Sequence, residues 1–245
     1  GGKRVILYTT SDGSTLTPQN MGTCDNSEYG VLVFANNVTA IGNSAFSGCY
    51  KLASITLPEG VTTIGDNAFD GCGRLNSITF PTSLITIGEG AFHGCGFSDI
   101  TWPASVTSIG PSVFEYCNNL TSITLPEGVT TIGNEAFSGC RGLTSITLPE
   151  GVTTIGDYAF SGCGFTEIIL PSSLISLGNR VFERCNLISI DVQRWVDGDT
   201  YPITQISNMT FFECTIQHIY VPSGSVGTYK AAAGWSEYRE NISEY

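Results

Sequence analysis

A short string of residues recurs along this chain at almost constant spacing, and this repeat limits the possible folds more than any other feature. The string is Ile-Gly-x-x-Ala-Phe-x-x-Cys, and a second string, Leu-x-x-Ile-x-Leu-Pro, precedes most copies. The copies begin at Ile41, Ile64, Ile87, Ile109, Ile132, Ile155, Leu177 and Ile206. They are 22 or 23 residues apart, with a last step of 29. This period is typical of a solenoid, in which each coil buries apolar side chains against the next.

Each repeat predicts two short strands and one tight turn. Ser-Ile-Thr-Leu and Val-Thr-Thr-Ile alternate polar and apolar residues, which favours strands, and Pro-Glu-Gly or Pro-Ser-Ser between them favours a turn. The glycine after the repeat isoleucine is expected to supply a positive φ. Ala-Phe-x-Gly-Cys is expected to form one helical or 3-10 turn. The expected contacts between two successive coils are Ile123 with Ile146, Leu125 with Leu148, Ile132 with Ile155, and Phe137 with Phe160.

The sequence therefore predicts a right-handed leucine-rich-repeat solenoid, mainly β with some α structure. Short parallel strands are expected to stack one per coil, with helical or 3-10 turns on the other side. Residues 29–222 hold about eight repeats of 22–23 residues, with an insertion at 193–205. Residues 1–28 are predicted to form an N-terminal cap and residues 223–245 a C-terminal helical cap. Caps are expected because an end coil otherwise exposes the core and an open strand edge.

The C-terminal cap is expected to contain one short helix from Val226 to Ala233. Ser223 or Ser225 is its expected N-cap, and Gly234 is expected to end it. Two aromatic residues beyond the helix are expected to cover the last coil, namely Trp235 and Tyr238.

Composition excludes several classes of function. The formal net charge is −12 and only 13% of residues are charged, so we expect neither nucleic acid nor anionic membranes as partners. No run of 18 apolar residues exists, so no membrane insertion by this segment is expected. Residues 1–4 do not have the pattern of an export signal.

The repeat, best seen from Leu120 to Cys140 and from Leu143 to Cys163, resembles the BspA-like leucine-rich-repeat family of bacterial cell-surface proteins. Residues 6–13 are similar to family N-termini, and residues 220–235 to family C-termini. The resemblance implies export, display at the bacterial cell surface, and adhesive binding to host or bacterial macromolecules. It supplies no catalytic motif. The copy at 206–211, which lacks the usual glycine and alanine, departs from the pattern.

Eight of the nine cysteines occupy one repeat position, and Cys24 stands apart. Equivalent positions in stacked coils form a column about 4.8 Å apart, within reach of a disulfide. The side chains of such a column point the same way, however, so we expect a ladder of buried free thiols. No Cys-x-x-Cys pair or neighbouring histidine set provides zinc ligands, so neither a metal nor a cofactor is expected.

The remaining chemically active side chains are expected to be structural. His93 occupies a variable position and is expected at the surface rather than as a base for Cys95. Glu59, Glu127 and Glu150 recur in the Pro-Glu-Gly turn. Repetition of a solvated turn explains them better than acid–base catalysis, and a weak calcium site is the alternative.

The outward residues of the Leu-x-x-Ile-x-Leu strand form the candidate binding surface, because this strand lines the concave side of leucine-rich repeats. In the middle coils these residues form a ladder of hydroxyls, whereas the last coils are more varied. The structural alternative is that serine and threonine simply suit exposed strands. The candidate contacts are Asp99, Thr101, Ser122, Thr124, Ser145, Thr147, Glu167, Ile169, Ser189, Asp191, His218 and Tyr220. Trp195 in the insertion is a second candidate contact.

The function that the sequence favours is a non-catalytic extracellular binding or adhesion module, which is expected to act as a monomer on a protein or glycan ligand. A passive structural spacer or scaffold of the cell envelope is the main alternative. An enzyme requires a pocket of convergent polar groups, whereas repeat columns supply rows. Ice or crystal binding by the Ser-x-Thr ladder requires a flat face.

Overall fold

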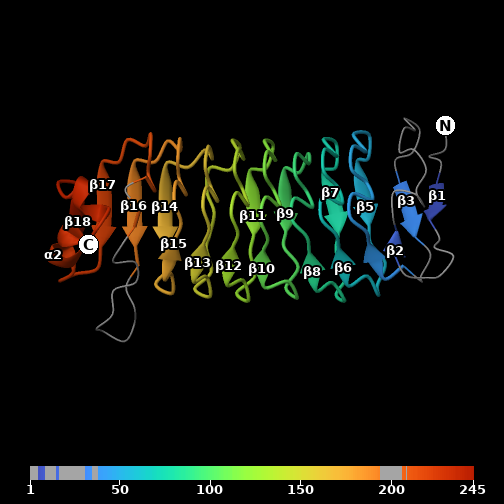
Figure 1. Ribbon diagram of the computed structural model, residues 1–245, viewed down its shortest axis with the longest axis horizontal. Coiled ribbons are helices and arrows are strands. Elements are labelled where there is room, and N and C mark those ends of the chain that lie inside the picture. The colour runs from blue at the N-terminus through green and yellow to red at the C-terminus, as the bar shows by residue number, and fades with distance from the viewer. Residues whose placement is uncertain (1–4, 9–14, 17–30, 35–37, 194–205, 208) are drawn as a thin grey trace.

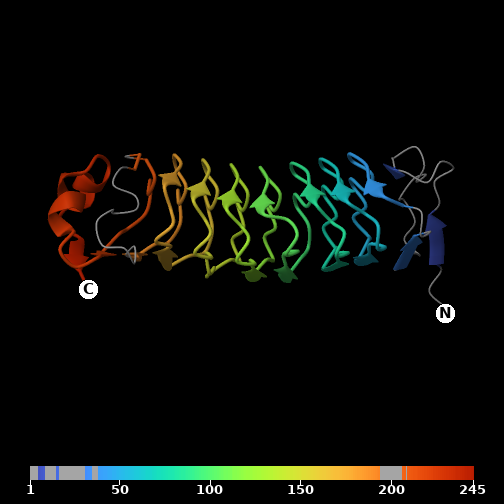
Figure 2. The same cartoon turned by 90° about the horizontal axis from the view of Figure 1, so that it is seen from below.

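The computed structural model describes residues 5–8, 15–16, 31–34, 38–193, 206–207 and 209–245. The chain winds into a stack of coils that forms an elongated rod, with β1 (Val5–Tyr8) near one end and α2 (Val226–Ala231) at the other (Figures 1 and 2). All strand pairs are parallel and join equivalent residues of successive coils, for example Ile132 with Ile155. The predicted solenoid is therefore confirmed.

Two rows of strands run along the rod (Figure 1). The first row contains the Ser-Ile-Thr strands and the strands aligned with them: β1, β3 (Val31–Phe34), β5 (Ser54–Thr56), β7 (Ser77–Thr79), β9 (Asp99–Thr101), β11 (Ser122–Thr124), β14 (Glu167–Leu170), β16 (Ser189–Val192), β17 (His218–Val221) and β18 (Ile242–Glu244). The second row contains the shorter strands: β2 (Thr15–Leu16), β4 (Ala40–Ile41), β6 (Thr63–Ile64), β8 (Thr86–Ile87), β10 (Ser108–Ile109), β12 (Thr131–Ile132), β13 (Thr154–Ile155) and β15 (Ser176–Leu177).

Neither row is continuous. β7 does not pair with β9 in the first row, and β8 does not pair with β10 in the second. The expected strand at residues 145–147 is not formed, although Ile146 still packs against the core. Each row is therefore divided into separate sheets, and the coils differ more than their sequences suggest.

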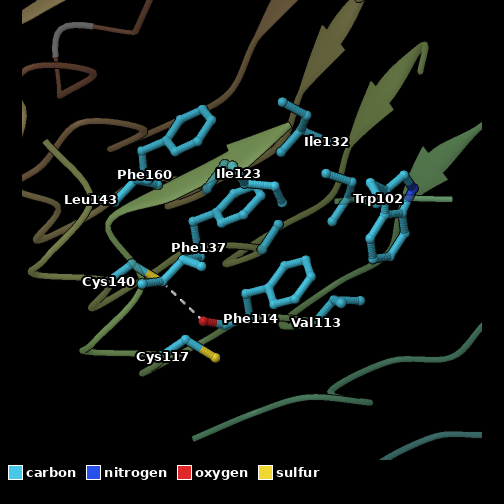
Figure 3. Close-up of a cluster of buried hydrophobic side chains, with 14 of the residues drawn as sticks. Trp102, Val113, Phe114, Cys117, Ile123, Ile132, Phe137, Cys140, Leu143 and Phe160 are labelled. Atoms are coloured by element: carbon cyan, nitrogen blue, oxygen red, sulfur yellow. Dashed lines mark hydrogen bonds between the residues drawn. The ribbon is translucent and has the colours of Figure 1, made fainter. Parts of the chain in front are cut away.

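The core consists of columns of identical side chains from successive coils. The repeat phenylalanines stack almost parallel: Phe114 and Phe137 lie 5.4 Å apart between ring centroids, at an interplanar angle of 14°. Phe137 stacks on Phe160 in the same way, as Figure 3 shows. The isoleucine at the start of each repeat is also fully buried in Ile132 and Ile155. A coil alone cannot bury these groups, so stacking supplies most of the hydrophobic stabilisation.

The turn corner at Ala-Phe-x-Gly-Cys is close to the expected single helical or 3-10 turn, since its local bonds join residues three apart. In the described coils it is a run of turns, with Cys140 donating its N–H to Phe137 O at 3.1 Å. Other N–H groups of the same segment bond to the next coil, such as Phe137 N–H to Ala159 O at 2.8 Å. The corner thus forms a third ladder along the rod, because alternate peptide groups point along its axis.

The glycine after the repeat isoleucine does not have the expected positive φ. It is required by close approach: a Cβ at Gly133 would lie 2.8 Å from Gly110 C and from Pro111 N. Positive φ occurs two residues later instead, at positions that include Asn67 and Glu135, with φ of 53° and 57°. The sequence identified the constrained glycine but gave the wrong physical reason.

The cysteine column is a thiol ladder, as expected, with one exception. Cys72, Cys95, Cys117, Cys140, Cys163, Cys185 and Cys214 are free. Each thiol donates to the carbonyl of the repeat phenylalanine one coil earlier; Cys140 Sγ lies 3.0 Å from Phe114 O (Figure 3). Cys49 is disulfide-bonded and so departs from the expected free thiol. Cys24 lies outside the described residues.

The C-terminal segment closes the rod with a helix, a 3-10 turn and a strand. α2 begins at Val226, as expected, but ends at Ala231, and Ser225 at its N-cap donates its hydroxyl to Pro222 O rather than capping the helix. Trp235, in the 3-10 turn η1 (Trp235–Tyr238), is buried against Phe211. β18 then adds a fourth strand beside β17, which the sequence did not predict.

Candidate binding surfaces

The outward residues of the first strand row lie where the alternation predicts. Exposed side chains belong to Asp99, Thr101, Ser122, Thr124, Ser145, Thr147, Glu167, Ile169, His218 and Tyr220. Ser189 and Asp191 are half-buried. Trp195, with most of the insertion at 193–205, lies outside the described residues. The candidate contacts therefore share one side of the rod but are distributed over several separate sheets.

We call the outer face of β14, β16 and β17 the C-terminal strand face, defined by Glu167, Ile169, Ser189, Asp191, His218 and Tyr220. These residues form two rows across the strands. Parallel register aligns Glu167, Ser189 and His218 in one row, and Ile169, Asp191 and Tyr220 in the other. A single continuous sheet thus brings all six side chains together.

Apolar and aromatic groups are exposed on this face. The exposed fraction is 51% for Ile169 and 37% for Tyr220. The ring of His218 stacks on that of Tyr220, with centroids 5.9 Å apart and an interplanar angle of 16°. Equivalent positions in the middle coils carry serine and threonine, so this end of the row is chemically distinct.

Tyr245 contributes a contact that the repeat pattern did not reveal. Its hydroxyl donates to Asp191 Oδ1 and lies 3.0 Å from Val192 O. Partial burial raises the pKa of the Asp191 carboxyl above its ordinary value. The contact was missed because Tyr245 belongs to no repeat and reaches Asp191 only through the unpredicted strand β18.

A second feature lies between β7 and β9, where the first row is interrupted. It is a cleft of about 920 Å³, which we call the β7–β9 cleft; its walls include Asn76, Thr79, Phe80, Asp99, Thr101 and Trp102. Phe80 and Trp102 occupy positions that carry leucine in four other coils, as at Leu57 and Leu125. This exchange of leucine for larger rings is the sequence feature that marks the cleft, but the repeat pattern alone does not reveal it.

The other titratable candidates take part in contacts between coils. His93 Nδ1 lies 2.7 Å from Asp70 Oδ1 of the preceding coil, so His93 is only half-exposed. Cys95 Sγ instead donates to Phe69 O at 3.2 Å, so His93 and Cys95 have different hydrogen-bond partners.

The turn glutamates are also structural. Glu59 accepts from the Thr82 hydroxyl at 3.0 Å, and Glu150 from the Ser172 hydroxyl at 2.6 Å. The carboxylates of Glu59 and Glu150 therefore join turns of adjacent coils. Among residues 38–193, 206–207 and 209–245, no three His, Cys, Asp or Glu side chains are arranged to hold a metal ion.

Comparison with known families accounts for the repeat. The family model for the BspA type leucine rich repeat region matches six copies, over residues 39–146 and 130–223. The chain belongs to this family. As expected of a BspA-type protein, it is similar to solved bacterial leucine-rich-repeat structures, whereas no curated protein sequence matches it.

Two solved structures show how far the BspA-type likeness extends. A leucine-rich repeat protein from Bacteroides ovatus is 27% identical over 89% of this chain, with a TM-score of 0.58. The T. pallidum leucine rich repeat protein is 32% identical over 66% of this chain and 72% of its own, with a TM-score of 0.52. This chain covers only 61% of the Bacteroides ovatus protein. In the part of the BspA-type chain that the structure describes, no helix combines the length and apolarity needed to cross a membrane.

Proposed function

We propose that this protein is a non-catalytic binding module that acts outside the bacterial cell, where its C-terminal strand face contacts a protein or glycan. One observation carries the proposal. The exposed strand row carries serine and threonine in its middle coils, but Ile169, Tyr220 and His218 in the continuous sheet at its end. Aromatic and apolar groups rimmed by polar ones are typical of binding surfaces.

The geometry of the face favours binding over catalysis. Its side chains lie in two rows on an open sheet, whereas catalysis requires groups that converge on one reacting atom. Asp191, the carboxylate in the middle of the face, is already bonded to the Tyr245 hydroxyl. An open face of this kind suits a macromolecule with a complementary surface.

Composition and family support the proposed location and partner class. BspA-type repeats imply display at the cell surface, and the net charge of −12 disfavours nucleic acid as a ligand. The main alternative is a passive spacer. It is favoured by the uniform Ser-x-Thr pairs of the middle coils, which need no ligand to explain them.

The test begins with an unbiased screen of the purified chain against extracellular-matrix proteins and a glycan array. Ile169→Glu with Tyr220→Glu is then compared with the native chain, because both changes add charge at exposed positions of the C-terminal strand face. We expect at least about a tenfold loss of affinity for the ligand found.

The matched control is Thr124→Glu with Thr147→Glu, which adds the same charges at the equivalent position of two middle coils. This variant is expected to keep its affinity. A screen without any ligand would support the spacer instead. Equal affinity of both variants for a ligand that was found would contradict the role of the C-terminal strand face.

A further inference from the structure

Both strand rows are interrupted at one junction, between the coils of β7 and β9, whereas the other breaks in the described first row leave the second row paired. Leu57 N–H donates to Thr79 O at 3.1 Å, and Trp102 N–H donates to Thr124 O at 3.0 Å. The equivalent bond between these two, from Phe80 N–H to Thr101 O, is not formed, although the structure describes both residues. Figure 1 shows the wider interval between β7 and β9 than between β5 and β7.

The second row is interrupted at the same junction. Gly88 N–H donates to Ile64 O and Gly133 N–H to Ile109 O, each at 2.8 Å, but Gly110 N–H makes no equivalent bond to Ile87 O in this described stretch. The turn corner remains closed, since Phe92 N–H donates to Val113 O at 3.0 Å. The coils that contain β7 and β9 are therefore joined at the turn corner and separated along both strand rows.

Large aromatic side chains account for the separation. The rings of Phe80 and Trp102 meet edge to face, with centroids 6.4 Å apart, and Trp102 contacts Phe114 in the same manner at 5.5 Å. Trp102 Nε1 also donates to Val106 O at 3.0 Å, which fixes the indole. Two rings fill a space that two leucines fill elsewhere, so these coils do not approach to the usual parallel-strand spacing of about 4.8 Å.

The separation leaves strand edges without partners on both walls of the β7–β9 cleft. Thr79 O accepts a bond from the preceding coil. Thr101 is the equivalent residue one coil later. Its carbonyl and its N–H therefore both point toward β7 in the preceding coil. On the opposite wall the Phe80 N–H points toward β9. Unpaired edges of this kind are templates for another strand.

We propose that the β7–β9 cleft binds an extended peptide, which inserts as an additional strand between β7 and β9. Main-chain groups of the peptide would bond to Phe80 on one wall and to Thr101 on the other, as in other complexes formed by strand addition. Asp99 lies at the exposed mouth of the cleft and the chain carries a net charge of −12, so the favoured peptide is cationic. This site is separate from the C-terminal strand face and does not depend on the function proposed for it.

The first test uses synthetic peptides of about seven residues that alternate Thr and Val between terminal lysines. Binding is measured by fluorescence anisotropy, and hydrogen exchange of residues 76–80 and 98–102 locates it. We expect binding with protection of both segments, and at least about tenfold weaker binding when glutamate replaces the terminal lysines. Absence of binding at about 1 mM peptide would overturn the proposal.

The second test separates strand pairing from side-chain contact. N-methylation of alternate central amides removes main-chain donors, so it is expected to weaken binding at least about tenfold, whereas methylation of a terminal amide is not. Equal binding of both methylated peptides would show that the cleft does not pair with a strand.

Protein variants complete the test. Thr101→Pro removes the N–H that faces the cleft and is expected to abolish binding, whereas Thr101→Ala removes only the exposed side chain and is expected to keep it. Circular dichroism verifies that both variants fold.

Phe80→Leu with Trp102→Leu restores the leucines of the repeat and is expected to close the cleft and prevent binding. Unchanged binding by Thr101→Pro and by the double variant would contradict the proposal.

Discussion

The buried thiols are the residues whose chemistry this fold changes most. Burial raises the pKa of Cys117 and Cys185 to about 12 and that of Cys214 to about 11. A thiol in the column lies among apolar groups and donates to a carbonyl, so its ionised form is strongly disfavoured. These thiols are consequently poor nucleophiles and metal ligands, because both roles require the thiolate.

Alkaline pH is therefore expected to destabilise the protein. Above about pH 9 the thiols of the unfolded chain ionise while the buried thiols keep their protons. The native state then binds more protons than the unfolded state, so the free energy of unfolding falls by up to about 1.4 kcal/mol per pH unit for each thiol, until the raised pKa is reached. Urea unfolding with reductant, compared between about pH 8 and pH 10.5, measures this slope. Cys117→Ala should show a shallower slope, and a slope of zero in the native chain would contradict the prediction.

Among the elements, adjacent coils approach each other closely at the repeat glycine. The absence of a side chain at Gly133 lets its backbone pack directly on Gly110 and Pro111. The neighbouring turn is less restricted, since a Cβ at Gly128 would come no closer than 3.8 Å to Thr107 Cγ2. Two glycines of one coil thus differ in what they tolerate.

Gly133→Ala is expected to lower the free energy of unfolding by about 1–3 kcal/mol, because the added methyl group would overlap backbone atoms that cannot move independently. Urea denaturation followed by circular dichroism measures the loss. Gly128→Ala is the control and is expected to change stability by less than about 0.5 kcal/mol. Equal effects of the two substitutions would mean that close approach is not the constraint.

At the scale of the whole molecule, the interrupted ladders predict uneven stability. A solenoid is stabilised by interfaces between neighbouring coils, so the junction beside the β7–β9 cleft is expected to be weaker than the others. In native-state hydrogen exchange with urea, we expect residues 38–95 to lose protection at lower urea than residues 98–193. The continuous sheet from β10 to β15 serves as the control, since its strands should lose protection together. Identical urea dependence of both halves would show that the junction is not weakened.

The sequence predicted the repeated parts of the molecule better than its exceptions. Periodicity fixes which residues face the core, so the columns of Phe137 and Ile132 and the thiol ladder were predictable. The β7–β9 cleft was not, because it depends on how two large rings pack against each other. The contact of Tyr245 with Asp191 was also hidden, since it joins residues outside the period. Most of the candidate contacts are exposed on one side of the rod, but a repeat pattern alone cannot indicate which of them bind.

The near-identity of adjacent coils has a consequence for how such a protein changes over time. Contacts between the middle coils repeat at an interval of 23 residues, as in the bond from Asp157 N–H to the Asn134 side chain. Duplication or loss of one such unit therefore recreates an interface that already exists. The length of the rod can therefore change by one coil at a time, while its two ends and their surfaces stay the same.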